Sequence, residues 1–519
     1  MKKYILSVAL GVASLFSTSC SDEDYSQFYN DPSLTTKVSC EKIMTGVFRA
    51  GNDYTQPSYW RMWTFDNGYI GKFAGVVGFM NGDGRYCVSD GYPEDRWQNF
   101  YTVLNQYRLL ENTYNNLPDE EKSSNEVFVI LAKIFLYDHL EQVISMWGDV
   151  PFSKAGFLGL TGDVANSYPA YEDDQTLYQL ILDDLKTLES KLASMTNLPT
   201  VTTGYLTAQD YFCKGDLTMW RKYANSLRLR VAMRVASQGA LASNGQAVVK
   251  ELLSGSYLLL ENGEAIEVLG DQDGFKIDNG QQNAGYLTTY RNLASKQMLD
   301  VLGTDDPRLD VMYDHNKNGE YIGLYPEEPY QNQLNYLEGV STANYYYAVC
   351  DSATFGYNMK HPGLLMASSE VAFLKAEAYQ KGYVNGDAKA AFVNGVKNHV
   401  DYMFYMNGLS EYRPALAVPA ASDIEAFAAS RWEDATDKYK AIIEQKWLAL
   451  GFIQACNAWA EVRRTGIPAI TFPADPTSVI CPNVPNRLRY PNEERNSNPN
   501  NYATVQSQDN YTDKLFWAK

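Results

Sequence analysis

Apolar residues at helical spacing run through most of this chain, and they restrict it to an architecture of packed helices. The segment from Asp174 carries apolar residues at successive spacings of 4, 4, 3 and 4, namely Leu177, Ile181, Leu185, Leu188 and Leu192. Such spacing places side chains on one face of an α-helix. Asp216 is suited to an N-cap, and another apolar face follows it, formed by Leu217, Trp220, Ala224, Leu227 and Val231. Both segments are therefore predicted to be amphipathic helices.

Further helices are expected to follow one another along the sequence in pairs. The pattern predicts helices over 94–116, 124–147, 366–382, 386–407 and 437–464. The last of these ends in Arg463-Arg464, with Gly466 and Pro468 just beyond, which is a helix-stop signature. Short connections between paired helices are typical of tetratricopeptide-type units, although the strict 34-residue consensus is poorly matched.

The predicted fold class is therefore mainly α, with about four tetratricopeptide-like helix pairs supporting an irregular, loop-rich half. The scaffold of helix pairs is expected over about 94–250 and 366–466. Gly- and Tyr-rich stretches over about 51–93 and 255–365 lack helical periodicity. Long irregular segments on a rigid scaffold are where binding residues tend to lie. The polar stretch 482–519 is expected to wrap the surface.

The first twenty residues resemble a secretory signal that ends in a lipid-attachment site. Residues 1–19 combine two lysines with an apolar run too short to span a bilayer, and Cys20 follows three small residues, as in the lipobox of bacterial lipoproteins. No later stretch has 18 consecutive apolar residues. The sequence therefore predicts removal of 1–19 and a single domain over 20–519, anchored to a membrane through lipid on Cys20. A plain secreted protein is the alternative.

Charge excludes one class of partner. The 519 residues carry a net charge of −18, from 44 basic and 62 acidic side chains. Binding to a nucleic acid requires clustered Lys and Arg to neutralise phosphates, so no nucleic-acid partner is expected. The 39 tyrosines instead favour binding to sugars or at hydrated interfaces, because a Tyr ring has an apolar face and a polar edge.

Four separate blocks resemble one known family. They are Trp147-Gly148-Asp149-Val150-Pro151-Phe152, the run from Trp220 to Arg230, the run from Lys446 to Gly466, and Arg489-Tyr490-Pro491-Asn492-Glu493-Glu494. In this order they resemble the SusD/RagB family of nutrient-binding outer-membrane lipoproteins, in its SusD-like branch, over nearly the whole mature chain.

The resemblance implies several properties that the residues alone do not give. It implies a mainly helical fold, exposure on the outer surface of the outer membrane and no catalytic activity. Apart from the calcium candidate described below, the sequence predicts no cofactor. The resemblance also implies a SusC-like TonB-dependent transporter as partner, which the lipoprotein covers like a lid. Family members bind oligosaccharides, and some bind peptides. The matched blocks are scaffold elements, so they do not identify the ligand.

Candidate ligand contacts come from the two irregular regions, which correspond to the family's binding segments. The residues we select are Asp83, Arg85, Tyr86, Tyr92, Tyr345, Tyr346 and Tyr347. Aromatic rings stack on sugar faces, and the charged groups bond hydroxyls or carboxylates. At most two of the three consecutive tyrosines face one ligand if that segment is extended. Tyr59, Trp60 and Trp63 are equally compatible with a core role and a binding role.

No catalytic constellation is recognisable. The sequence contains no HExxH, GxSxG, P-loop or GxGxxG motif, and its four histidines lack metal-ligand spacing. A weak calcium candidate consists of Asp314, Asn316 and Asn318, which occupy alternate positions before Gly319. An asparagine–glycine turn explains the same residues. The favoured function is oligosaccharide binding without catalysis, and the alternatives are peptide binding and, less favoured, a surface glycosidase.

Overall fold

The computed structural model describes residues 38–56, 59–78, 80–87, 89, 91–165, 167–270, 293–337, 346–451 and 453–519. The predicted signal segment 1–19 and Cys20 lie outside them. The described part is mainly helical, as the periodicity predicts. It contains two short antiparallel sheets, which pair β1 (Ala265–Val268) with β4 (Gly363–Ala367) and β2 (Tyr313–Asp314) with β3 (Val349–Cys350).

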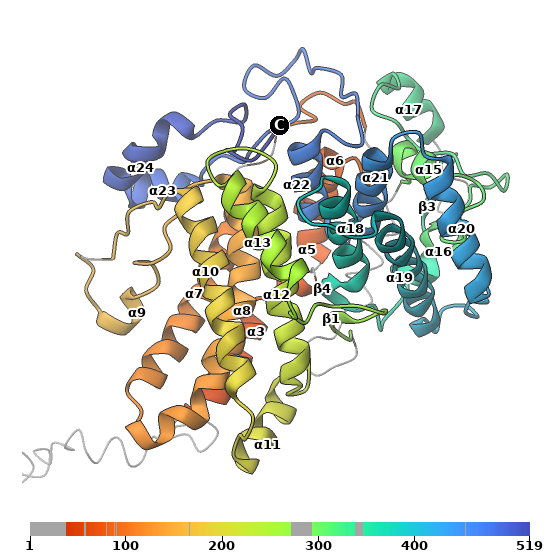
Figure 1. Cartoon of the computed structure of the whole chain (residues 1–519). Coiled ribbons are helices and arrows are strands. Elements are labelled where there is room, and N and C mark those ends of the chain that lie inside the picture. Colours follow the sequence, from red (N-terminus) through yellow and green to blue (C-terminus); the bar gives the residue numbers. More distant parts are fainter. Residues whose placement is uncertain are drawn as a thin grey trace, which may run out of the picture.

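One half of the scaffold is a layer of long helices that run side by side (Figure 1). It comprises α3 (Cys40–Ala50), α7 (Gly91–Asn115), α8 (Asp119–Trp147), α10 (Asp174–Ser194), α11 (Thr200–Gln209), α12 (Leu217–Val235) and α13 (Ala242–Ser254). The expected apolar face of α10 is buried throughout. Asp216 caps α12 as predicted, because its carboxylate accepts the N–H groups of Thr218 and Met219 at 2.8 and 3.1 Å.

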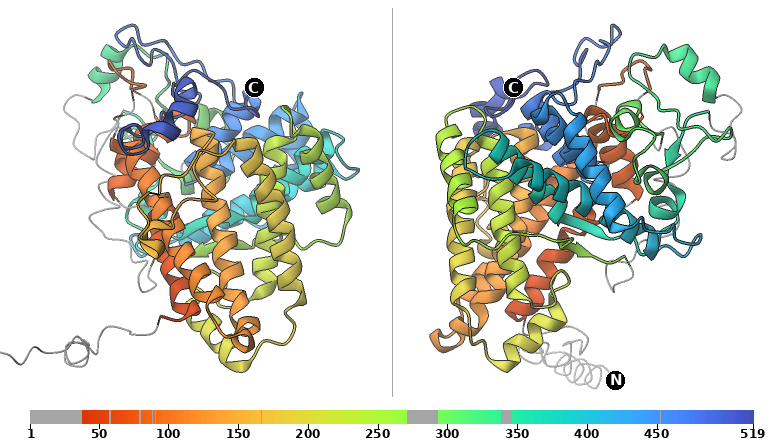
Figure 2. Two further views of the ribbon diagram at one scale, coloured as in Figure 1. Left: turned by 90° about the vertical axis from the view of Figure 1, so that its left-hand side faces the viewer. Right: turned by 45° about the vertical axis from the view of Figure 1, so that its right-hand side comes forward.

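The other half contains the second group of helices (Figures 1 and 2). It comprises α18 (Ser368–Gln380), α19 (Ala388–Leu409), α20 (Ala421–Asp434), α21 (Lys438–Leu450) and α22 (Ala455–Thr465). The predicted single helix over 437–464 is wrong, because the chain breaks at Gly451. Its φ of +50° lies in the left-handed region that glycine adopts readily. The pairs α7–α8, α10–α12, α18–α19 and α21–α22 match the expected tetratricopeptide-like arrangement.

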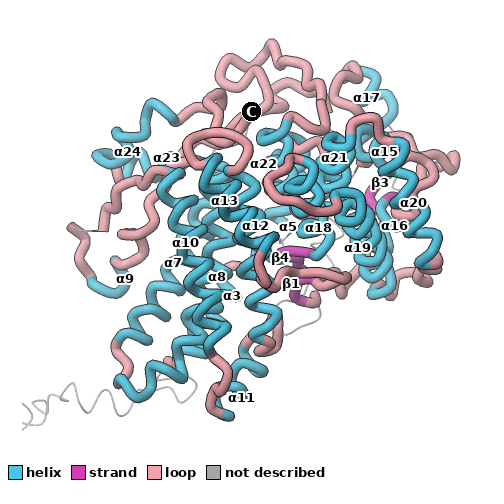
Figure 3. The backbone as a smooth tube through the Cα atoms, in the orientation of Figure 1, coloured by secondary structure: helices cyan, strands magenta, loops and turns pink. Residues whose placement is uncertain are grey.

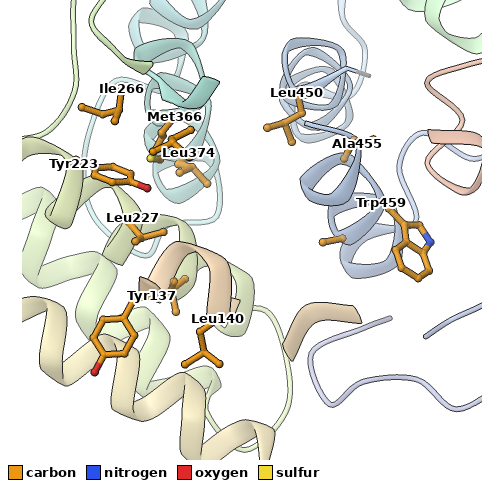
Figure 4. Close-up of a cluster of buried hydrophobic side chains, with 14 of the residues drawn as sticks. Tyr137, Leu140, Tyr223, Leu227, Ile266, Met366, Leu374, Leu450, Ala455 and Trp459 are labelled. Carbon is orange, nitrogen blue, oxygen red and sulfur yellow. The ribbon is translucent and has the colours of Figure 1, made fainter. Parts of the chain in front are cut away.

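A continuous core joins the two halves (Figure 4). Tyr137 and Leu140 of α8 lie near Leu227 of α12, and Met366 and Leu374 continue the cluster toward the second group of helices. At the far end, Trp459 of α22 is fully enclosed. Burying a side chain such as Leu227 or Met366 stabilises the folded state by about 1.5–3 kcal/mol. This shared core fixes the halves relative to each other.

Buried ion pairs join the helices of the second half to one another and, through Arg230 and Glu370, to the first half. Arg464 contacts Glu377 at 2.7 Å and Glu461 at 2.6 Å, and Lys446 contacts the same two carboxylates at 2.9 and 2.7 Å. Burial alone raises the pKa of Glu461, but the adjacent cations overcome this and hold it below its ordinary value. Arg230 likewise contacts Asp138 and Glu370, at 3.0 and 2.7 Å. We call Arg230, Asp138, Glu370, Glu377, Lys446, Glu461 and Arg464 the buried ion network.

The segments expected to be irregular contain short helices, shown against the surrounding loops in Figure 3. The first segment includes α4 (Asn52–Thr55), α5 (Tyr59–Arg61), the π-helix η1 (Met62–Ile70) and α6 (Gly71–Phe73). The second includes α15 (Lys296–Leu302), α16 (Leu309–Met312) and α17 (Tyr330–Leu337). These elements are too short to show the periodicity on which the sequence analysis relied.

The tail packs closely onto the scaffold and contains α23 (Asn492–Ser497) and α24 (Pro499–Val505). Trp147 Nε1 donates to the carbonyl of Arg489 at 2.9 Å, and the Tyr490 hydroxyl donates to the carbonyl of Asp149 at 2.8 Å. Near the end of the chain, Trp517 is completely buried. Among the described residues, no helix is both long enough and apolar enough to cross a membrane.

Candidate functional site

Three irregular segments that are far apart in the sequence meet along one edge of the molecule. They are 80–87, 325–337 and 473–481, and we call them together the rim (Figures 1 and 2). Asn81 joins the first two, since its backbone N–H donates to Gln333 Oε1 at 2.7 Å and its side chain donates to the carbonyls of Pro326 and Glu328. The early loop and the central insertion, predicted to act together, are therefore in contact.

The first and third segments of the rim are held together by charged and polar side chains. Arg85 donates to the carbonyl of Ala474 at 2.8 Å and to that of Asn81 at the same distance. The backbone N–H of Gly84 donates to Asp475 Oδ2 at 2.7 Å. Gly84 has a φ of +71°, which lets the loop turn back at this point. These contacts give the rim a defined shape without burying it.

An exposed aromatic group lies where the early irregular segment enters α7. Trp60 of α5 is 53% exposed, and its ring meets that of Tyr92 edge to face with centroids 5.7 Å apart. Tyr92 is half-buried and also contacts the ring of Tyr69, at 6.0 Å. We call these three side chains the aromatic platform. A large exposed indole, contacted by one phenol that a second phenol contacts in turn, can stack on an apolar ligand face.

A second pair of rings lies on the rim. Tyr336 of α17 stacks on Tyr346 with centroids 4.0 Å apart and planes only 7° apart, and both are half-buried. Tyr330 of the same helix is 41% exposed, and its ring would lie 3.4 Å from a Cβ placed on Gly82. These rings can also offer apolar faces to a ligand.

Two of the predicted contact residues are packed into the structure instead. Tyr86 is fully buried, burial raises its pKa to about 12, and its hydroxyl donates to the carbonyl of Pro473 at 2.6 Å. Tyr347 is 1% exposed and donates to Glu328 Oε2 at 2.8 Å. As placed, neither ring reaches a ligand, and both instead fasten the rim. Arg85 has the same structural role, through its carbonyl contacts.

The remaining predicted residues are placed differently. Asp83 is exposed at the tip of the early loop, Tyr92 belongs to the aromatic platform, and Tyr346 belongs to the stacked pair. Tyr345 lies outside the described residues. Two of the alternatives, Tyr59 and Trp63, have side chains outside the described part as well. The prediction of ligand contacts therefore retains Asp83, Tyr92 and Tyr346.

The predicted calcium ligands are already occupied by protein groups. Asp314 accepts from Arg413 Nη1 at 2.9 Å through one oxygen and from the backbone N–H of Ser352 at 2.8 Å through the other. The buried Asn316 oxygen accepts the backbone N–H of Asn318 at 2.9 Å. This bonding is the one expected of the asparagine–glycine turn, the alternative explanation of these residues.

Sequence reasoning left Trp60 undecided and missed Tyr336 as a stacking partner of Tyr346. The two tyrosines are ten residues apart in a segment without periodicity, so spacing gave no reason to join them. The available signal was the density of tyrosines between 321 and 347. It indicated the region, but it could not separate buried from exposed rings.

The geometry defines a class before any comparison: a helix-pair scaffold that presents an edge of irregular segments with exposed aromatic rings. A family model described as "Starch-binding associating with outer membrane", SusD-like, matches residues 53–491. The chain belongs to this SusD-like family, as its four sequence blocks suggested. No curated protein matches the chain.

Solved structures share the fold over almost the whole length. A chitin-binding protein superimposes with a TM-score of 0.72 at 21% identity, covering 92% of this chain and 100% of its own. A SusD homologue from Bacteroides fragilis gives 0.70 at 18% identity, covering 92% and 99%. A chitin-binding SusD homologue from Flavobacterium johnsoniae gives 0.67 at 19% identity, covering 91% and 98%. At identities this low, the structural likeness shows a common fold alone.

Proposed function

We propose that this protein is a cell-surface lipoprotein that binds an oligosaccharide and delivers it to a SusC-like TonB-dependent outer-membrane transporter, without catalysing any reaction. The observation that carries the proposal is the exposed Trp60 ring, supported by Tyr92 and Tyr69 in a protein of the SusD-like family. An open indole of this kind matches the apolar face of a sugar ring.

Charge and hydrogen bonding support a neutral glycan over a polyanion. The net charge of −18 repels phosphorylated or sulfated ligands. Asp83, exposed on the rim, can accept hydrogen bonds from sugar hydroxyls. Two structural neighbours are themselves described as chitin-binding, so soluble chitin oligosaccharides are suitable first probes beside starch fragments.

Ligand class is tested by calorimetry with three groups of probes, namely chitin oligosaccharides, starch oligosaccharides and short peptides. We expect saturable binding to at least one glycan and none to the peptides. Chromatography of the incubated mixture should show no shortened products. Saturable binding to peptides alone would replace the glycan assignment with the peptide alternative. Reproducible cleavage of a bound glycan would revive the glycosidase alternative.

The membrane anchor is tested separately, through Cys20. Acylation of its thiol buries fatty chains that contribute about 0.8 kcal/mol per CH₂ group, so several chains hold a protein firmly. The Cys20→Ala variant should therefore appear in the soluble fraction after a carbonate wash. The variant Cys40→Ala is the matched control, because Cys40 is buried in α3, and it should stay membrane-bound. Retention of Cys20→Ala in membranes would contradict the lipoprotein assignment.

A further inference from the structure

A polar cavity of about 290 Å³ lies on the scaffold, apart from the rim and the aromatic platform. Two of its walls are α18 and α19, and the third is the turn at 260–262 that precedes β1. Alanines at 372 and 391 line it with small side chains, which leaves room between the helices. None of the residues assigned to ligand binding above contributes to this cavity.

Four polar side chains in the cavity have unused hydrogen-bonding groups. They are Lys375 and Tyr379 on α18 and Asn394 and Asn398 on α19. None of these four makes a side-chain hydrogen bond or an ion pair with another described residue. The two asparagines are four positions apart, so they lie on the same face of α19. Together they supply donors from an ammonium, a phenol and two amides, and acceptors from the phenol and the amides.

The charges around the cavity disfavour an anionic occupant. The only cation among the lining residues is Lys375, whose pKa is lowered by burial. Two carboxylates also line the cavity, those of Glu261 and Asp387, and one Asp387 oxygen caps α19 by accepting the N–H of Ala390 at 2.9 Å. Nearby Lys222 is already paired with Glu264 at 2.5 Å. An anionic ligand would therefore add a third negative charge beside a single ammonium.

Hydroxyl groups fit this mixture better than an anionic group does, because each hydroxyl both donates and accepts hydrogen bonds. We propose that the cavity between α18 and α19 is a second binding site, for a neutral polyhydroxyl ligand of one or two sugar rings. Its volume lies at the small end of the range for ligand sites, about 300–1,000 Å³, which limits the ligand to this size. Lys375 and the amides of Asn394 and Asn398 would bond the hydroxyls, and the alanines would leave space for the ring.

Saturation-transfer NMR on the full mature chain tests this site with glucose, N-acetylglucosamine, maltose and, as a carboxylate probe, propionate. We expect saturable transfer to at least one sugar in the millimolar range. The double variant Asn394→Ala/Asn398→Ala should weaken it about tenfold or more, since each lost hydrogen bond contributes about 1 kcal/mol. Alanine is favoured within a helix, so this variant should fold.

Two controls separate this site from the aromatic platform. Gln380→Ala changes an exposed residue of α18 that does not line the cavity, and it should leave binding unchanged. Trp60→Ala should also leave it unchanged, whatever it does to oligosaccharide binding at the platform. Sugar binding that is lost in Trp60→Ala but kept in the double asparagine variant would overturn the proposal. Absence of saturable transfer to every sugar would overturn it too, as would propionate binding that depends on Lys375.

Discussion

The scaffold and the rim use polar side chains in opposite ways. In the scaffold, charged groups pair with one another inside the protein, as Arg464 does with Glu377 and Glu461. On the rim, polar groups bond backbone carbonyls, as Arg85 does with Ala474 and Asn81 does with Glu328. The first arrangement joins helices whose positions are already set by the core. The second gives shape to loops that have little core of their own.

Two kinds of tryptophan environment illustrate this contrast. A helix pair buries its apolar face against its neighbour, so its large side chains are enclosed, as with Trp220 and Trp459. A short element such as α5 has fewer neighbours and leaves Trp60 mostly open. Trp60 can therefore be replaced without disturbing the paired helices. The difference predicts that substitutions in the two regions affect different properties.

The largest effect is expected in the buried ion network. Arg464→Met leaves Glu377 paired with Lys446 alone, and Glu461 paired with Lys446 and with the more distant Arg234 at 3.6 Å. Removing one partner from a buried ion pair costs about 3–5 kcal/mol of unfolding free energy, because a charge stays buried without compensation. Urea unfolding followed by circular dichroism measures this loss. Lys389→Met, which breaks an exposed pair with Glu433, is the control and should cost about 1 kcal/mol or less.

If Arg464→Met is as stable as Lys389→Met, the buried ion network does not stabilise the packing of α18, α21 and α22, and the contrast between scaffold and rim fails for the scaffold.

A smaller effect, dependent on pH, is expected at the start of α10. Asp149, Asp173 and Asp174 lie close together, and burial, followed by the two neighbouring carboxylates, raises the pKa of Asp174 to about 7. The folded protein therefore retains a proton on Asp174 that the unfolded chain releases near pH 4. The contribution of the protonated Asp174 carboxyl to the free energy of unfolding is complete below pH 4 and is lost as the pH rises toward 7.

The variant Asp174→Asn removes this dependence, because its amide does not titrate. Relative to the variant, the wild type should lose at most about 1.4 kcal/mol per pH unit between pH 4 and 7. Thermal unfolding across that range measures the difference, with Asp183→Asn, an exposed position on the same helix, as control. Parallel curves for wild type and Asp174→Asn would show that Asp174 is ionised throughout.

The smallest effect on stability is expected on the rim. Arg85→Ala removes the donors to Ala474 and Asn81, each worth about 1 kcal/mol of local stability. Amide hydrogen exchange should become faster in 473–481, while the midpoint of global unfolding hardly moves. Asp83→Ala, at an exposed neighbour, should leave exchange unchanged. If affinity for the glycan falls tenfold without faster exchange, Arg85 contacts the ligand directly, as the sequence analysis first predicted.

The sequence predicted the scaffold well because each helix carries its own periodic signal. The faces of α10 and α12 were read from spacing alone, and Asp216 was identified as a cap. The break at Gly451 was missed, since apolar residues continue at helical spacing on both sides of it. The blocks that revealed the family include Arg464 and Glu461, which build the buried ion network. They report on the fold and carry no information about the ligand.

The site was harder to predict, because tyrosines look alike in sequence whether they are buried or exposed. Tyr86 and Tyr347 were selected as contacts and prove to be enclosed, whereas Trp60 was left undecided and proves to be open. What decides each case is a partner distant in the chain, such as the carbonyl of Pro473 that accepts from Tyr86. Such pairings depend on how loops meet, and no local pattern encodes them.

The central claim, that the aromatic platform binds the glycan, is tested most directly by comparing two exposed aromatic residues. Trp60 and Tyr412 are each 53% exposed, but Tyr412 lies on a different part of the surface, stacked on Tyr357. Calorimetry with whichever glycan binds in the screen proposed above should show that Trp60→Ala weakens binding by about 2 kcal/mol, or roughly thirtyfold, with folding intact. Tyr412→Ala should bind as the wild type does. Equal affinities for wild type and both variants would contradict the account and place the ligand elsewhere.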